Sequence, residues 1–161
     1  MRTLAIAAAC AVALAGARCA RADGDPASDY LLVQRVFVPF EGAVEAKQQQ
    51  ELTKEVAAVN KAGFSIRVAV IFSSYDLGSV TALWHKPTTY ARFLGVELSF
   101  VYKQRLLVVM PNGFGFNWPK HSPKEGYAVL AKVPVQHGTA GLIASATAAV
   151  QKLAAAAGVK T

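Results

Sequence analysis

The sequence is poor in cysteine, and both of its cysteines stand near its beginning. Cys10 and Cys19 are the only two in 161 residues, and both fall in a segment that we interpret as a signal peptide. The domain that remains after cleavage would contain no thiol. This excludes a disulfide framework, a redox pair and a thiolate metal site in that domain.

Long apolar runs are also absent. A membrane-spanning helix needs about 18 to 20 apolar residues, whereas the run over residues 4–15 has only about a dozen. Arg2 precedes this run, and Ala20-Arg21-Ala22 follows it as an A-x-A cleavage site. We therefore expect a signal peptide over residues 1–22 that is cleaved after Ala22, and a secreted or periplasmic, extracytoplasmic protein that is soluble after cleavage. The alternative is a protein anchored in the membrane by its uncleaved signal.

Acidic residues are scarce in the second half of the chain. From residue 98 onward there are 7 basic residues against Glu125 alone. Such an imbalance attracts anionic envelope polymers or a membrane surface, and export argues against a nucleic acid as the partner. The alternative interpretation is a solvated lysine face that binds nothing.

The chain shows no internal repeat, and its length suits one domain. Residues 23–29 are polar and include Gly24 and Pro26, which predicts a flexible leader. A single α/β domain is then expected over residues 30–161.

Hydrophobic patterns predict alternating strands and helices. Nearly continuous apolar runs indicate buried strands, and the spacing of Leu52, Val56 and Val59 indicates a helix that ends at Gly63. The expected elements are strands over residues 30–38, 66–72 and 105–110, a hairpin over 111–116, helices over 43–62, 87–98 and 139–158, a short helical piece near 80–84, and a short helix or strand over 127–133.

Strands that are apolar on both sides must be covered on both faces. We therefore expect a single three-layer α/β/α domain around a mixed central sheet. The alternative is a two-layer α+β sandwich in which all the helices pack on one face.

The order of these elements over residues 30–116 resembles the TPM domain, a family of small extracytoplasmic α/β/α modules. The resemblance includes the helix that ends at Gly63, the helix that carries Tyr90-Ala91, and Gly113-Phe114-Gly115. The segments 25–29 and 107–111 also resemble small secreted actinobacterial proteins of no assigned function.

TPM members that bind divalent cations or show phosphatase activity carry an acidic loop before the third strand. This sequence has Tyr102-Lys103-Gln104-Arg105 there. Hard cations require carboxylate oxygens, so the resemblance implies the fold without the phosphatase chemistry.

No motif specific to a catalytic reaction is present, and the catalytic residues stay unknown. Ser73, Ser74 and Asp76 follow a buried strand, with His85 downstream, so a small TPM-like hydrolase that also uses Asn112 is one alternative. The chain has no G-x-S-x-G elbow, and serine and aspartate after a strand are ordinary turn formers.

The sequence predicts neither a metal site nor a cofactor. Its three histidines, His85, His121 and His137, are far apart, and none forms an H-x-x-x-H pair on one helical face.

The best candidate for a binding surface is the loop that follows the hairpin, where aromatic side chains alternate with cations. Aromatic faces beside cations suit sugars, anionic polymers or lipid headgroups. The alternative is that these aromatics fold inward as part of a core. The candidate binding residues are Phe114, Phe116, Trp118, Lys120, His121 and Lys124.

Three hypotheses of function follow. An exported accessory domain that binds an anionic ligand predicts that Trp118, Lys120 and Lys124 are exposed together. A hydrolase predicts polar side chains that converge in a cleft near Ser74 and Asp76. A structural or self-associating envelope protein predicts an exposed apolar face on the C-terminal helix.

Overall fold

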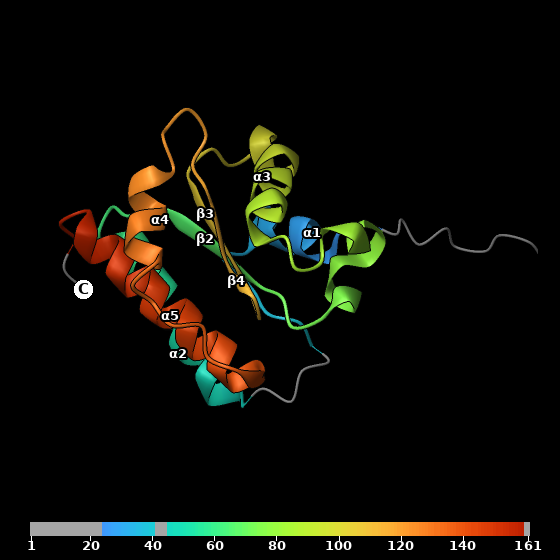
Figure 1. The fold of residues 1–161 in the computed structure, drawn as a ribbon. Helices are drawn as coiled ribbons and strands as arrows, with labels where there is room; N and C mark the ends of the chain where they lie inside the picture. Colours follow the sequence, from blue (N-terminus) through green and yellow to red (C-terminus); the bar gives the residue numbers. More distant parts are fainter. Residues whose placement is uncertain (1–23, 41–44, 160–161) are drawn as a thin grey trace, which may run out of the picture.

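The structure is a computed structural model that describes residues 24–40 and 45–159. The proposed signal peptide, its cleavage site at Ala22 and the first two residues of the helix expected over 43–62 lie outside the described residues. Figure 1 shows the arrangement of the elements. In chain order they are α1 Pro26–Val33, β1 Val36–Phe37, α2 Ala46–Lys61, β2 Ile66–Val70, the 3₁₀ helix η1 Ser74–Leu83, α3 Pro87–Glu97, the 3₁₀ helix η2 Leu98–Phe100, β3 Arg105–Met110, β4 Gly113–Asn117, α4 Lys124–Leu130 and α5 Gly138–Ala156.

The described strands form one sheet in the order β1-β2-β3-β4. β1, β2 and β3 run parallel, and β4 returns antiparallel to β3 through a tight turn. The expected mixed α/β fold is therefore confirmed. Because β4 reverses direction, its last residue lies at the edge where the three parallel strands begin.

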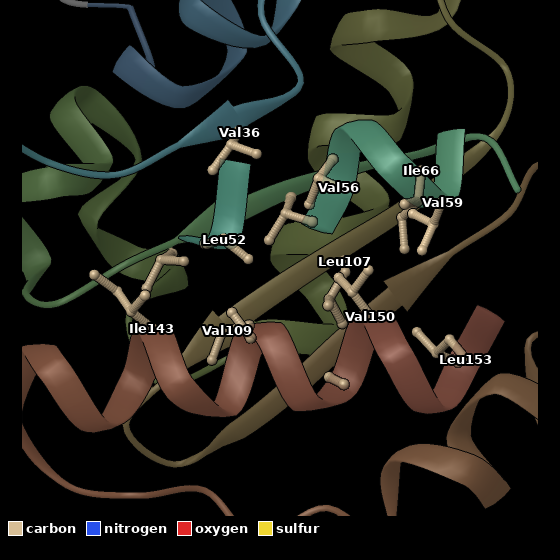
Figure 2. Close-up of a cluster of buried hydrophobic side chains, with 14 of the residues drawn as sticks. Val36, Leu52, Val56, Val59, Ile66, Leu107, Val109, Ile143, Val150 and Leu153 are labelled. Atoms are coloured by element: carbon tan, nitrogen blue, oxygen red, sulfur yellow. The ribbon is translucent and has the colours of Figure 1, made fainter. Parts of the chain in front are cut away.

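Both faces of the sheet are covered. On one face, α2 and α5 pack against alternate strand residues that include Leu107 and Val109. Figure 2 shows α2 and α5 on this face of the sheet, with Leu52 and Val56 of α2 on one side of the cluster and Val150 of α5 on the other. On the opposite face, α1 and α3 pack against the intervening residues, which belong to a second buried cluster.

The prediction for the beginning of the domain was wrong up to residue 33, whereas Val36–Phe37 is a strand as expected. Residues 30–33 are helical, not extended, and residues 24–29 are not a loose leader, because Asp25 and Ala27 are buried. Asp25 caps α1 by accepting a hydrogen bond from the Ser28 backbone N–H, and Pro26 supplies the fixed φ that suits a first helical turn. Ala27 and Leu31, four residues apart, then point to the core. The cap and this spacing outweigh the strand preference of the apolar run.

The later elements agree with the patterns. α3 begins at Pro87, β3 spans the expected residues, and the segment expected as helix or strand over 127–133 lies partly in α4. One detail differs. α5 begins at Gly138 with His137 as its N-cap, so Thr139 is a helical residue and not the cap.

Candidate functional site

The β3–β4 hairpin brings the predicted loop to the amino-terminal edge of the sheet. Leu106 pairs with Asn117, so the next residues outward along the two strands are Arg105 and Trp118. Phe114, Phe116 and Trp118 alternate along the chain and share one side of β4. This alternation places the indole of Trp118 on the same side of the sheet as α5.

Arg105 is held between two aromatic rings. Its guanidinium carbon lies 3.7 Å from the centroid of the Trp118 ring and 4.3 Å from that of Phe64. The His121 ring stacks on the outer side of Trp118, with centroids 3.7 Å apart and planes inclined by 12°. The four side chains therefore form a continuous stack, which we call the arginine–aromatic stack: Phe64, Arg105, Trp118 and His121.

Burial lowers the pKa of the Arg105 guanidinium from its ordinary value, while the neighbouring Tyr102 opposes that shift. An arginine remains charged through such a shift, since a guanidinium does not lose its proton in proteins near neutral pH. A cation stacked on an aromatic face gains roughly 0.5 to 2 kcal/mol from the ring quadrupole. The stack therefore holds a permanent positive charge in a fixed orientation.

Three members of the stack, Phe64, Arg105 and Trp118, form one wall of a pocket of about 120 Å³. Ser122 and Glu125 add a hydroxyl and a carboxylate to the pocket, and the end of α5 closes its apolar side. The indole N–H of Trp118 is buried and has no hydrogen-bond partner among the described residues. The remaining lining residues are Phe116, Gly126, Val129, Leu153, Ala156 and Ala157.

α4 fixes the pocket wall to the edge of the sheet. The Tyr127 hydroxyl accepts a hydrogen bond from the Phe116 N–H at 3.0 Å and donates one to the Phe116 carbonyl at 3.2 Å. It thereby satisfies two backbone groups on the outer edge of β4. A Cβ atom on Gly126 would lie 2.6 Å from the Phe116 ring, so only glycine lets the helix approach so closely.

The predicted binding residues fall into two groups. Lys120, His121 and Lys124 are exposed. Phe116 is buried, and Phe114 and Trp118 are half-buried against the core. Phe114 pairs with Val109 farther along the hairpin and does not line the pocket. Trp118 is therefore both packed against the core and part of the pocket lining, while its role in binding stays a prediction.

Sequence reasoning missed Phe64, Arg105 and Glu125 as members of this site. Arg105 could have been found by counting outward from the expected turn at residues 111–113, because that register sets it opposite Trp118. Phe64 lies some forty positions before Arg105 in the chain, and the sequence carried no signal for its approach.

The residues of the alternative hydrolase site are engaged in turns. The Asp76 carboxylate accepts hydrogen bonds from the Phe72 and Ser73 backbone N–H groups at 2.8 and 2.7 Å. The Asn112 amide donates to the His85 carbonyl at 2.6 Å. These contacts are those of turn formers and helix caps.

Across residues 24–40 and 45–159, no three histidine, cysteine or acidic side chains come together as a metal site would require. The same residues include no helix that is long and apolar enough to cross a bilayer. The exposed positions of α5 carry alanine, glycine, glutamine and lysine, and no large apolar side chain.

A buried acid lies far from the pocket. Asp25 accepts a hydrogen bond of 2.5 Å from the hydroxyl of Tyr90, which is itself fully buried. Burial raises the pKa of Asp25 from 3.8 to about 6, although the Tyr90 hydrogen bond opposes the shift. Burial, with the charge of Asp25 beside it, raises the pKa of Tyr90 well above its ordinary value. The phenol therefore stays protonated and donates to the carboxyl.

The site and the fold together describe a mixed α/β domain with a preformed cationic pocket. Comparison of the chain with protein-family models, with curated proteins and with solved structures finds no match. Its function must therefore be argued from the pocket itself.

Proposed function

We propose that this chain is an exported, non-catalytic accessory domain of a bacterial envelope that binds an anionic, sugar-containing polymer. The observation that carries the proposal is the guanidinium of Arg105, held between the Phe64 and Trp118 rings at the wall of an open pocket. Lys120 and Lys124 are exposed on the loop that follows.

The chemistry of the pocket suits such a ligand. A guanidinium pairs with a carboxylate or phosphate through a planar fork of N–H donors. Glu125 and Ser122 can hydrogen-bond the hydroxyl groups of a sugar ring. Stacking already restricts Arg105, so little side-chain entropy is lost when the ligand binds. The exposed lysines add long-range attraction to the next charges along a polymer.

We also propose that the fold is a TPM-like three-layer α/β/α arrangement without the cation chemistry of that family. The helices on both faces of the sheet support the layers. Lys103 and Arg105 precede and begin β3, where cation-binding members carry acids. This supports a site for anions there.

Binding can be tested by titrating the protein with polygalacturonate, using uncharged dextran as the control polymer. The chain has two tryptophans, so a Trp84→Phe background leaves Trp118 as the reporter of the pocket. We expect its fluorescence to change with polygalacturonate and not with dextran. Replacing Lys120 and Lys124 with alanine should weaken binding by roughly tenfold and flatten its salt dependence.

A matched control removes the same charge from elsewhere on the surface. Lys54 and Lys61 are exposed on α2, and their double alanine variant should bind as the wild type does. If the Lys120 and Lys124 variant also binds unchanged, or if no anionic polymer alters the fluorescence of Trp118, the proposed function is wrong.

Export is tested separately. The full-length protein is expressed in a bacterial host, the host is fractionated, and the intact mass is measured. We expect a species that begins at Asp23 in the soluble exported fraction. A full-length species in the membrane fraction, or a lipid adduct on Cys19, would overturn the assignment to a soluble exported protein.

A further inference from the structure

A second surface lies at the same end of the sheet as the pocket but on the opposite face, beside α1 and α3. None of its residues lines the pocket. Three apolar side chains near the end of α3 are exposed. They are Val96 in α3 (68%), Phe100 in η2 (95%) and Val101 directly after η2 (59%). Val33, the last residue of α1, is 80% exposed. Large apolar side chains exposed to this degree and close together mark an interaction surface.

Arg67 joins the two apolar groups. Its guanidinium donates to the Leu31 carbonyl in α1 and lies 4.2 Å from the centroid of the Tyr102 ring. The Arg67 guanidinium therefore contacts both the end of α1 and the segment that follows η2. The helices α1 and η2 are themselves in contact. Leu31 lies two residues before Val33, and Tyr102 directly follows Val101, so the contacts of Arg67 link the chain next to both apolar groups.

The charge around these apolar groups is mostly positive. Arg35 precedes β1 next to Arg67, and the charge of Arg35 further lowers the pKa of Arg67, which burial already depresses. Like charges on neighbouring strands repel each other, so an anion between them would relieve a cost that the free protein bears. Lys103 is exposed shortly before β3, and the exposed acids of α1 and α3 nearest the apolar groups in sequence are Asp29 and Glu97.

We propose that this surface, which we call the basic apolar edge, docks on an anionic lipid bilayer: Val33, Val96, Phe100 and Val101 enter the interface while Arg35, Arg67 and Lys103 contact lipid phosphates. The combination of protruding apolar side chains with surrounding cations is the one that anionic interfaces select. This inference goes beyond the polymer-binding function, because none of these residues lines the pocket, and α1, α3 and η2 pack on the face of the sheet opposite to α5.

The position of the surface supports a bilayer as the occupant. The apolar side chains stand at the end of the molecule where the parallel strands begin, and the arginines lie between them. A flat anionic surface can meet both groups at once. The Arg67 guanidinium is anchored to backbone and ring, so it is held at the surface before any lipid binds.

The test is cosedimentation of the protein that begins at Asp23, after removal of the signal peptide, with two kinds of vesicle. One contains phosphatidylcholine and phosphatidylglycerol, and the other contains phosphatidylcholine alone. We expect binding to the anionic vesicles only, weakened by added salt. A Phe100→Ser and Val101→Ser double variant should lose about tenfold in affinity, because part of the transfer of an apolar side chain out of water is lost.

The matched control is Tyr75→Ser. Tyr75 is 86% exposed and lies in η1, which follows the carboxyl end of β2, so this variant should bind vesicles as the wild type does. An Arg35→Gln and Lys103→Gln variant should weaken binding and reduce its salt dependence. Far-UV circular dichroism of each variant checks that these exposed substitutions leave the fold intact.

Several results would overturn the proposal. These are equal binding to both vesicle types, no binding to either, or an equal loss in the Tyr75 control. Sedimentation equilibrium can give a further result that overturns the proposal. If the wild type self-associates and the Phe100 and Val101 variant does not, a second copy of the chain occupies the surface instead of a bilayer. The Lys120 and Lys124 variant should keep its vesicle binding, so the membrane proposal and the polymer proposal fail independently.

Discussion

Neutralising Asp25 should remove a pH dependence of folding stability that the wild-type protein carries. The carboxyl has a pKa of about 6 in the folded protein and 3.8 as its ordinary value. Below about pH 4 it is protonated in both states, and its contribution to stability is fully present. Between about pH 4 and pH 6 the unfolded chain has released this proton while the folded protein still holds it, so stability falls as the pH rises.

The magnitude follows from the size of the shift. The pKa rises by about two units, and each unit corresponds to 1.36 kcal/mol, so the loss amounts to about 3 kcal/mol between about pH 4 and pH 7. The physical origin is the removal of a charged carboxylate from water, which the single hydrogen bond from Tyr90 only partly offsets. An Asp25→Asn variant is neutral throughout this range and should lack the loss.

Urea denaturation followed by circular dichroism at pH values from about 4 to 7 gives the free energy of unfolding of both proteins. The difference between the wild type and Asp25→Asn should shift by about 3 kcal/mol in favour of the variant as the pH rises. Asp29→Asn is the control, because Asp29 is exposed on the same helix. A difference that stays constant with pH, or one that shifts in favour of the wild type, would refute the reasoning.

Three further substitutions test the packing. Gly115→Ala would press a methyl group into the Pro87 carbonyl and should cost about 3 kcal/mol in urea denaturation; wild-type stability would contradict the close approach of α3 to β4. Ser145→Ala leaves the Gln136 N–H without its 2.8 Å acceptor and should cost about 2 kcal/mol in thermal unfolding, whereas no loss would mean that another group replaces the hydroxyl. Tyr90→Phe removes a hydrogen bond that lowers the pKa of Asp25, so the loss of stability should begin at the same pH and extend to higher pH; an unchanged upper limit would argue against the hydrogen bond.

The elements with strong local signals could be predicted from the sequence. α2 shows a helical spacing of Leu52 and Val56 and meets Gly63 at its end, where a φ of +95° requires glycine. Pro87 marks the start of α3, and β3 is a nearly unbroken apolar run. In each case the local preference and the tertiary contacts favour the same structure.

α1 could not be predicted, because two local signals compete. The apolar run after Tyr30 favours a strand, while the Asp25-Pro26 pair favours a helix start. Besides the cap and the spacing of Ala27 and Leu31, a buried hydrogen bond between Asp25 and Tyr90, sixty-five positions later, favours the helix. The sequence shows neither that contact nor its strength.

The candidate site was predictable only in the part that comes from one continuous segment of the chain. The loop residues Trp118 and Lys120 were found by composition, and the hairpin register would have added Arg105. The second ring of the stack, Phe64, comes from the segment between α2 and β2. Only the packing of β2 beside β3 brings it within 4.3 Å of the guanidinium.

The two ends of the described chain differ in how they can be used as attachment points. The Gly24 carbonyl packs against Gly78 in η1, beyond the carboxyl end of β2, whereas Ala156 and Ala157 at the end of α5 line the pocket. In Figure 1, α1 and α5 accordingly lie on different sides of the sheet. A biotin or fluorophore placed ahead of Gly24 leaves the pocket facing solution, whereas the same label after Val159 crowds it. Immobilised-protein assays should therefore attach the molecule by its N-terminal side.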